Sequence, residues 1–163
     1  MKNRQNIYKI ATIVFILDQW IKLMISHMMQ EYDKITVIPN FFSIQYVKNK
    51  GAAFSILEDK SLLLIIISIV FILVLDKMIK KEKNFTKLSI LSLGMIIGGV
   101  FGNLMDRILY HSVIDYLSFI IINYHFPVFN LADIGITVGT FLLLITMIFD
   151  KKEKDDKKRS NEV

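Results

Sequence analysis

Two aspartates carry the strongest chemical signal in this sequence. Asp115 and Asp133 flank the short loop between the last two apolar stretches, in the runs Val-Ile-Asp-Tyr (113–116) and Phe-Asn-Leu-Ala-Asp (129–133). A carboxylate at the edge of hydrocarbon is costly unless it is paired, hydrogen-bonded or neutralised. If the fold brings these two together, they could act as the acid and the base of a hydrolase.

Two carboxylates a few ångströms apart cannot both ionise easily, so one pKa rises and the pair shares a proton. The ionised member can take a proton from water, while the protonated member polarises a peptide carbonyl and later protonates the leaving amine. This chemistry needs no nucleophilic side chain. It suits a chain with no cysteine, whose three histidines have no metal-ligand spacing. We expect neither a metal nor a cofactor.

Asp133 also has a structural interpretation. Asn130 is a good N-cap residue, and Asp133 follows three residues later, where the acid of a capping box belongs. Asp115 has no such alternative, because it lies in an apolar, aromatic segment with no adjacent base. Both interpretations of Asp133 stay open at this point.

The composition indicates a membrane protein. The chain has 163 residues, 53% of them hydrophobic, and its mean hydropathy is +0.48, too apolar for an ordinary soluble domain. Its net charge of +5 comes from lysines and arginines at the N-terminus, near residues 77–87 and in the tail. These segments flank apolar stretches, and the tail interleaves acids with bases, so we expect no nucleic-acid partner.

Four apolar stretches approach the length of about 20 residues that a helix needs to cross a bilayer. They cover about 7–28, 61–79, 88–105 and 131–149, within a single membrane domain spanning 1–150 and followed by a charged tail, 151–163. An even number of spans puts both termini on one side. The lysine-rich segments predict that this side is cytoplasmic and that Asp115 and Asp133 lie near the outer face of the bacterial cell membrane.

The first outer loop predicts a small sheet. Residues 42–46 alternate apolar and polar side chains, which is typical of a strand with one buried face, and Pro39-Asn40 is a turn signal before it. Residues 51–54 are small and apolar, suited to close packing. The predicted fold class is therefore an all-α membrane protein with four transmembrane helices and a small extracytoplasmic β-sheet.

Several polar groups lie inside or beside the spans. Asp18 and Lys22 are four residues apart and share a helix face, as an internal ion pair or as support for an active site. Asn103, Asp106 and Arg107 share another face near the outer boundary. Arg107 could form an interfacial salt bridge with Asp106, or it could hold a substrate carbonyl or a neighbouring carboxylate.

Glycines in the last two spans indicate close helix packing. Gly94, Gly98 and Gly102 recur at four-residue spacing in the third span, and Gly135 and Gly139 repeat the pattern in the fourth. Small residues in such a row let helices approach closely, so we expect a packing role.

Taken together, the motifs resemble those of lipoprotein signal peptidase, the type II signal peptidase of bacteria. Five signatures occur in order: Asp18-Gln19-Trp20-Ile21-Lys22, Asn49-Lys50-Gly51-Ala52-Ala53-Phe54, Gly98-Gly99-Val100-Phe101-Gly102-Asn103-Leu104-Met105-Asp106-Arg107, Val113-Ile114-Asp115-Tyr116 and Phe126-Pro127-Val128-Phe129-Asn130-Leu131-Ala132-Asp133. The resemblance covers nearly the whole chain apart from the tail.

This resemblance implies an intramembrane aspartic endopeptidase that cleaves prolipoproteins on the N-terminal side of a diacylglyceryl-modified cysteine. It implies that Asp115 and Asp133 are the catalytic dyad. The positions implied to support the dyad or the substrate are Asn49, Asn103, Arg107, Asn130, Asp18, Lys22 and Asp106. The expected partners are the prolipoprotein and membrane lipid, and we expect a monomer.

Two departures and two rival interpretations remain. His111-Ser112 stands where the family often has glycine, and Tyr116 replaces a more usual phenylalanine. One rival is a small proton-coupled transporter or channel with a polar pathway through Asp18, Lys22, Asp106 and Arg107. The other is a scaffold that recruits partners through its basic tail.

Overall fold

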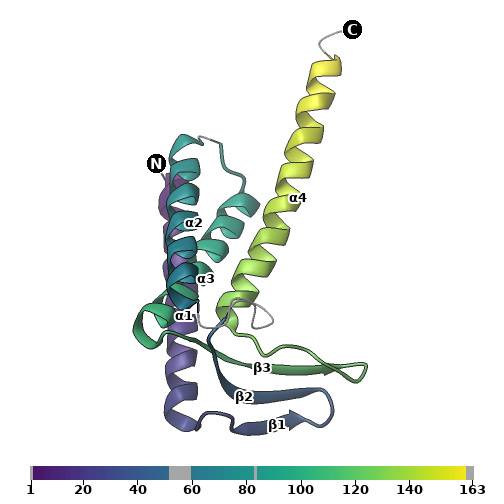
Figure 1. Ribbon diagram of the computed structural model, residues 1–163. Helices are drawn as coiled ribbons and strands as arrows, with labels where there is room; N and C mark the ends of the chain where they lie inside the picture. Colours follow the sequence, from purple (N-terminus) through teal and green to yellow (C-terminus); the bar gives the residue numbers. More distant parts are fainter. Residues whose placement is uncertain (1, 52–59, 83, 161–163) are drawn as a thin grey trace.

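Four long helices and a small sheet make up the part of the chain that the computed structural model describes, residues 2–51, 60–82 and 84–160. The helices are α1 (Lys2–Met28), α2 (Ser61–Lys81), α3 (Lys87–Tyr110) and α4 (Leu131–Ser160). Each is long and apolar enough to cross a membrane. Both termini lie at one end of the bundle and the sheet lies at the other (Figure 1). The expectation of four transmembrane helices with a small sheet is confirmed.

The helices extend beyond the apolar stretches that predicted them. α1 begins at Lys2 rather than near residue 7, and α4 continues to Ser160 rather than ending near 149. Hydropathy marks only the part of a helix that suits hydrocarbon, whereas the backbone hydrogen-bond ladder continues into polar sequence.

The sheet consists of β1 (Lys34–Ile38), β2 (Phe42–Asn49), β3 (Val113–Ile121) and β4 (Tyr124–His125), antiparallel and in that order. The strand expected at 42–46 is therefore confirmed, and Pro39-Asn40 lies in the turn before it. The sequence analysis did not predict β3, whose long apolar run has no clear alternation. The predicted packing segment 51–54 falls outside the described residues after Gly51.

A tight link joins α3 to β3. His111 caps α3 in the left-handed conformation, with φ 56° and ψ 17°, and its N–H donates to the Arg107 carbonyl. Glycine is the residue best suited to this conformation, so histidine adopts it here at some cost in backbone energy. β3 begins only two residues later, so the strand lies at the level where the span ends.

Helix α3 is the centre of the bundle and packs mainly on α1 and α4. Its glycines allow this approach. A Cβ on Gly98 would lie 2.5 Å from the Ala11 carbonyl oxygen on α1, and a Cβ on Gly99 would clash with the Ala132 carbonyl on α4. The packing role expected for the glycine stripe is confirmed.

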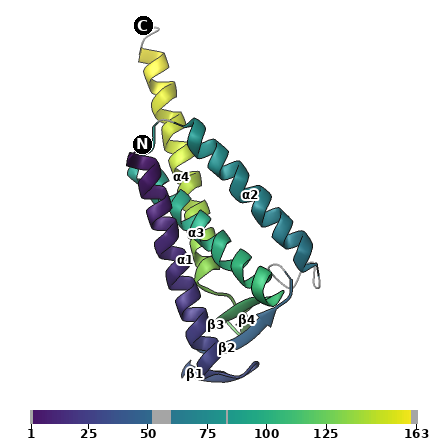
Figure 2. The same cartoon turned by 90° about the vertical axis from the view of Figure 1, so that its left-hand side faces the viewer.

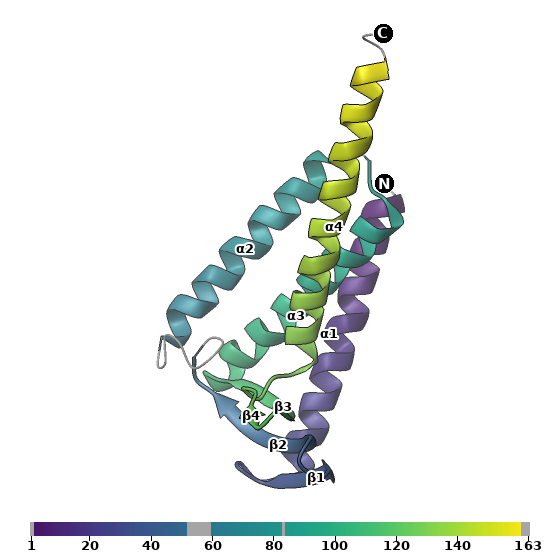
Figure 3. The same ribbon diagram turned by 90° about the vertical axis from the view of Figure 1, so that its right-hand side faces the viewer.

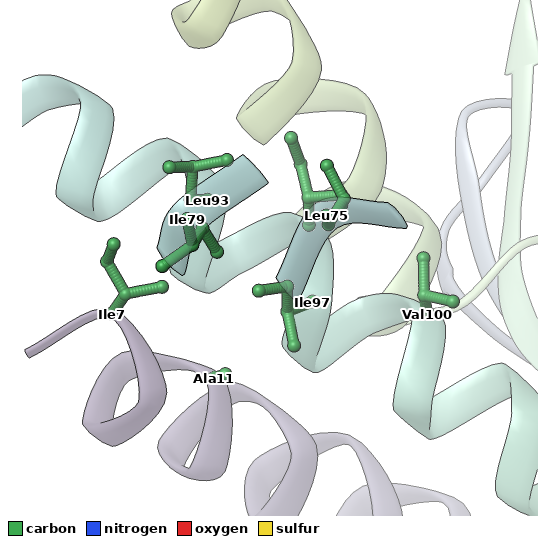
Figure 4. Close-up of a cluster of buried hydrophobic side chains, with 8 residues drawn as sticks. Ile7, Ala11, Leu75, Ile79, Leu93, Ile97 and Val100 are labelled. Atoms are coloured by element: carbon green, nitrogen blue, oxygen red, sulfur yellow. The ribbon is translucent and has the colours of Figure 1, made fainter. Parts of the chain in front are cut away.

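An apolar cluster closes the end of the bundle that carries the termini. Ile7 and Ala11 of α1 meet Leu75 and Ile79 of α2 and Ile97 of α3 (Figure 4). Toward its N-terminal end, α2 leans away from the other three helices (Figures 2 and 3). The bundle is therefore held together at one end and carries the sheet at the other.

Candidate active site

Asp115 lies on β3 in a buried position, only 2% exposed. It pairs in register with Val47 of β2, which places it beside the end of that strand. Its carboxylate accepts two amide hydrogen bonds, from Asn49 Nδ2 to Oδ2 at 2.9 Å and from Asn130 Nδ2 to Oδ1 at 2.6 Å. Both oxygens therefore have fixed directions.

Asp133 lies in the first turn of α4. Its N–H donates to Asn130 Oδ1 at 2.9 Å, and its Oδ2 accepts the Asn130 backbone N–H at 3.2 Å. This reciprocal pair is the predicted capping box. The other oxygen, Oδ1, accepts a 2.7 Å hydrogen bond from Asn103 Nδ2 of α3. Capping thus holds the carboxylate in place and uses only one of its oxygens.

Asn130 brings the two carboxylates together. Its side-chain amide donates to Asp115 while its backbone N–H donates to Asp133. The same amide also donates to Asn103 Oδ1 at 3.1 Å. One fully buried residue between β3 and α4 therefore contacts both aspartates.

A buried ion cluster lies beneath this site. Lys22 Nζ is 2.9 Å from Asp18 Oδ2, 2.9 Å from Asp106 Oδ2 and 2.9 Å from Asn103 Oδ1. The first expectation, an internal Asp18–Lys22 pair, is confirmed, and Asp106 joins it. Removing the lysine would leave two buried carboxylates without a counter-ion.

The cluster also holds the backbone next to each aspartate. Asp18 Oδ1 accepts the N–H of Ala132, the residue before Asp133, at 2.9 Å. Asp106 Oδ2 accepts the N–H of Ile114, the residue before Asp115, at 3.0 Å. The internal ion pair is therefore also connected to the backbone beside both aspartates.

Arg107 contacts two backbone carbonyls, and its expected contact with a substrate carbonyl stays a prediction. Its guanidinium donates to the Gly51 carbonyl at 3.0 Å and to the Asn103 carbonyl at 3.2 Å. Among the described residues it forms no ion pair with Asp106, which is paired with Lys22 instead. Arg107 thus holds the segment that follows Asn49, and Asn49 itself accepts the Gly51 N–H at 2.9 Å.

Two polar residues make contacts here that were not expected from the sequence. Gln19 Nε2 donates to Asp106 Oδ1 at 2.9 Å and to the Gly102 carbonyl at 3.2 Å. Tyr116 Oη accepts the Leu131 N–H at 3.1 Å, at the start of α4. The available signal for Gln19 was a side-chain amide inside an apolar span, and for Tyr116 it was a hydroxyl where phenylalanine is more usual.

The environment of Asp115 favours its protonated form. Burial, followed by the charge of Asp133, raises the pKa of Asp115 to about 7, although the amides of Asn49 and Asn130 oppose this. A carboxyl group with this pKa can hold a proton at neutral pH and release it during a reaction. The arrangement is therefore suited to sharing a proton between two carboxylates.

Comparisons with known proteins agree with this geometry. The family model described as Signal peptidase (SPase) II matches residues 10–149. This chain belongs to the signal peptidase II family. A "Lipoprotein signal peptidase" of Clostridium tetani is 41% identical over 149 residues, covering 91% of this chain and 96% of that protein. One of Maridesulfovibrio salexigens is 36% identical over 147 residues, covering 87% and 94%.

Solved structures support the same fold. A bacterial membrane enzyme determined by the in meso method at 2.3 Å resolution superposes with a TM-score of 0.83 at 34% identity, covering 89% of this chain and 88% of that one. A second, at 1.9 Å, gives 0.76 at 34% identity, covering 85% and 89%.

As a signal peptidase II, the chain is a multi-pass membrane peptidase that removes signal peptides from prolipoproteins. The transporter interpretation needed Asp18, Lys22 and Asp106 to form a polar pathway. These side chains instead bond to one another and to the backbone beside the aspartates.

Proposed function

We propose that Asp115 and Asp133 are the catalytic dyad of this peptidase and that they direct water onto a peptide bond. The bond is the one on the N-terminal side of a cysteine carrying a diacylglyceryl group. The observation that carries the proposal is Asn130, whose side chain and backbone donate to the two carboxylates. The dyad needs such a bridge, because two carboxyl groups share a proton only when they are held close together.

The environments of the two aspartates suggest different roles. Asp115, with its raised pKa of about 7, holds the shared proton in the resting enzyme. Asp133 accepts from Asn103 and from the Asn130 N–H at the positive end of a helix, and these donors stabilise a negative charge. Asp133 is therefore the base in the first step and Asp115 is the acid.

The reaction then proceeds in two steps. Asp133 takes a proton from water as the water oxygen bonds to the carbonyl carbon, and Asp115 gives its proton to the carbonyl oxygen. The resulting diol then collapses. Asp133 returns its proton to the leaving nitrogen, the C–N bond breaks, and Asp115 recovers a proton from a hydroxyl group. Both carboxyl groups end in their starting states, and the pair titrates as a unit.

The remaining residues position the dyad in this proposal. Asn49 and Asn130 fix the oxygens of Asp115, and Asn103 fixes one oxygen of Asp133. Lys22, with Asp18 and Asp106, sets the orientation of Asn103 and the backbone before each aspartate. Arg107 acts indirectly: it donates to the Gly51 carbonyl and so holds the backbone just after β2 in place.

The substrate reaches the dyad from the outer leaflet of the cell membrane in this proposal. Both termini lie at one end of the bundle, and their basic segments favour the cytoplasmic side. The dyad lies at the opposite end, beside the start of α4 and the end of α3. A precursor held by its signal segment and its lipid chains would present its peptide bond at that depth. We propose that a monomer performs the reaction.

Asparagine variants test the dyad. Purified Asp115→Asn and Asp133→Asn, in detergent with a diacylglyceryl-modified precursor, should retain helical circular dichroism and lose cleavage. Asp33→Asn is the matched control, because Asp33 lies in the outer loop and its carboxylate accepts the nearby backbone N–H of Gln30. Mass spectrometry of the wild-type product should find the lipidated cysteine at its N-terminus. Full turnover by either dyad variant would rule out the mechanism.

A further inference from the structure

Two neighbouring hairpin tips on the sheet form an exposed patch without charge. Between Lys34 and Lys48 the first hairpin has no Asp, Glu, Lys or Arg, and the same holds for residues 116–132. The tips are joined: the Ile120 N–H donates to the Phe41 carbonyl at 2.8 Å, and the ring of Phe41 packs edge-on against Phe119, with centroids 5.5 Å apart. They therefore behave as one surface, which we term the tip patch: Ile38, Phe41, Ile121, Ile122, Tyr124 and Phe126.

The side chains of the tip patch are exposed although most are apolar. Ile122 is 97% exposed, and the other members of the patch are between 42% and 57% exposed. An exposed apolar surface of this kind indicates contact with something that excludes water.

Ile122 also occupies a backbone conformation that disfavours it. Ile122 and Asn123 form the two-residue turn between β3 and β4, with φ of 49° and 63°. Asparagine and glycine suit such a turn, whereas a β-branched residue at positive φ is rare. Turn formation therefore does not account for isoleucine here, and another role for this side chain is required.

The position of the patch indicates what covers it. β3 begins three residues after α3 ends, and Phe129, which bridges to Leu117 of β3, lies two residues before α4 begins. The sheet is thus at the level of the span ends. Its strands run across the helix direction, and both tips project sideways past α4 (Figure 1). In a membrane, that position lies over the lipids surrounding the bundle.

We propose that the tip patch inserts into the boundary between headgroups and acyl chains of the outer leaflet and holds the sheet on the bilayer. Tyrosine, phenylalanine and isoleucine with no nearby charge suit that boundary, where an apolar side chain is buried and a hydroxyl stays hydrated. The anchor would fix the height of β3, and with it Asp115, relative to the lipid. The proposal depends on the membrane spans and not on the cleavage mechanism.

The chain has no cysteine, so single cysteines can carry an environment-sensitive fluorophore. Ile121→Cys reports on the tip. Lys34→Cys is the matched control, because it lies at the other end of the same sheet and is also exposed. After reconstitution into phosphatidylethanolamine–phosphatidylglycerol vesicles, the label at 121 should be quenched by lipids with a nitroxide near the headgroup and protected from iodide. The label at 34 should show the opposite.

A second variant separates anchoring from folding. Asparagine suits the left-handed conformation, so Ile122→Asn should leave the turn intact while removing the apolar side chain. We expect it to reduce the lipid quenching of the label at 121. Equal iodide access at 121 and 34, or quenching that Ile122→Asn leaves unchanged, would overturn the proposal. Protection of the label only after precursor is added would also overturn it, in favour of a protein-docking surface.

Discussion

Lys22→Met tests whether the buried ion cluster positions the dyad or only stabilises the fold. Lys22 is almost fully buried and contacts Asp18, Asp106 and Asn103, each at 2.9 Å. Methionine retains most of the side-chain volume but removes the charge. The cluster changes from a formal charge of −1 to −2, and removing one partner of a buried ion pair costs about 3–5 kcal/mol. Stability should therefore fall strongly.

A compensating variant separates the two roles. In Lys22→Met with Asp18→Asn the cluster returns to a formal charge of −1, and the amide oxygen of the substituted side chain can still accept the Ala132 N–H that Asp18 Oδ1 accepts now. About half or more of the lost stability should return, because the uncompensated carboxylate is gone. Asn103 Oδ1 still lacks the shorter of its two donors, since only Asn130 remains, so the bond from Asn103 to Asp133 Oδ1 stays less well oriented. Activity should therefore remain low.

The assay measures both quantities on the same samples. Thermal unfolding in detergent is followed by circular dichroism. Turnover of the diacylglyceryl-modified precursor is measured at a temperature well below the lowest unfolding midpoint among the variants. Asp18→Asn alone is the matched control. If the double variant recovers activity in the same proportion as stability, Lys22 only stabilises the fold. If Lys22→Met unfolds like the wild type, the cluster is not energetically important and the reasoning is wrong.

Three further predictions concern pH, Arg107 and His111. Burial and the charge of Asp133 raise the pKa of Asp115 to about 7, and the proposed acid must be protonated, so kcat/KM should fall roughly tenfold per pH unit above that value. The contribution of Asp115 to stability is complete below its unfolded pKa of about 3.9 and should be lost as pH rises through about 7. A pH-rate profile that is flat from pH 6 to 9 would contradict the assignment of Asp115 as the acid. Arg107→Ala should reduce turnover more than truncation at residue 151, because Arg107 holds Gly51 beside Asn49; equal losses would show that this contact is unimportant. His111→Gly should raise the free energy of unfolding by about 1 kcal/mol or less, because His111 caps α3 at φ 56°. The left-handed conformation costs an L-residue about 1–2 kcal/mol, and the greater freedom of glycine in the unfolded chain offsets part of that gain. His111→Ala should bring no gain, and a similar gain in both would point to the imidazole rather than the backbone.

Local signals in the sequence predicted part of this structure well. Hydropathy located four helices, alternation located β2, and the Asn130–Asp133 spacing predicted a capping box that the hydrogen bonds reproduce. These features depend on residues close together in the chain. β3, by contrast, could not be predicted from local signals. Its burial comes from helices and strands distant in sequence, and its run of apolar residues has no clear period.

Long-range contacts account for what could not be predicted. The bond between Asp18 and the Ala132 N–H joins residues 114 positions apart, and the Arg107–Gly51 bond joins residues 56 apart. Nothing in the spacing of Asp18 and Lys22 indicates that their ion pair holds the start of α4. Likewise, Arg107 directly follows Asp106 in the sequence, which suggested a salt bridge between them. The helix instead directs their side chains toward different partners.

Asp133 shows that a structural role is compatible with the functional role proposed for the same side chain. The capping box uses Oδ2 and the backbone N–H of Asp133, and through Asn130 it fixes the residue that also donates to Asp115. Oδ1 is held separately by Asn103, which in turn is oriented by Lys22. A reactive carboxylate must be held within a fraction of an ångström, and a helix cap is one of the few local motifs that fixes an aspartate so closely. A capping box next to a second buried acid therefore suits the proposed dyad, and the capping signal does not count against catalysis at Asp133.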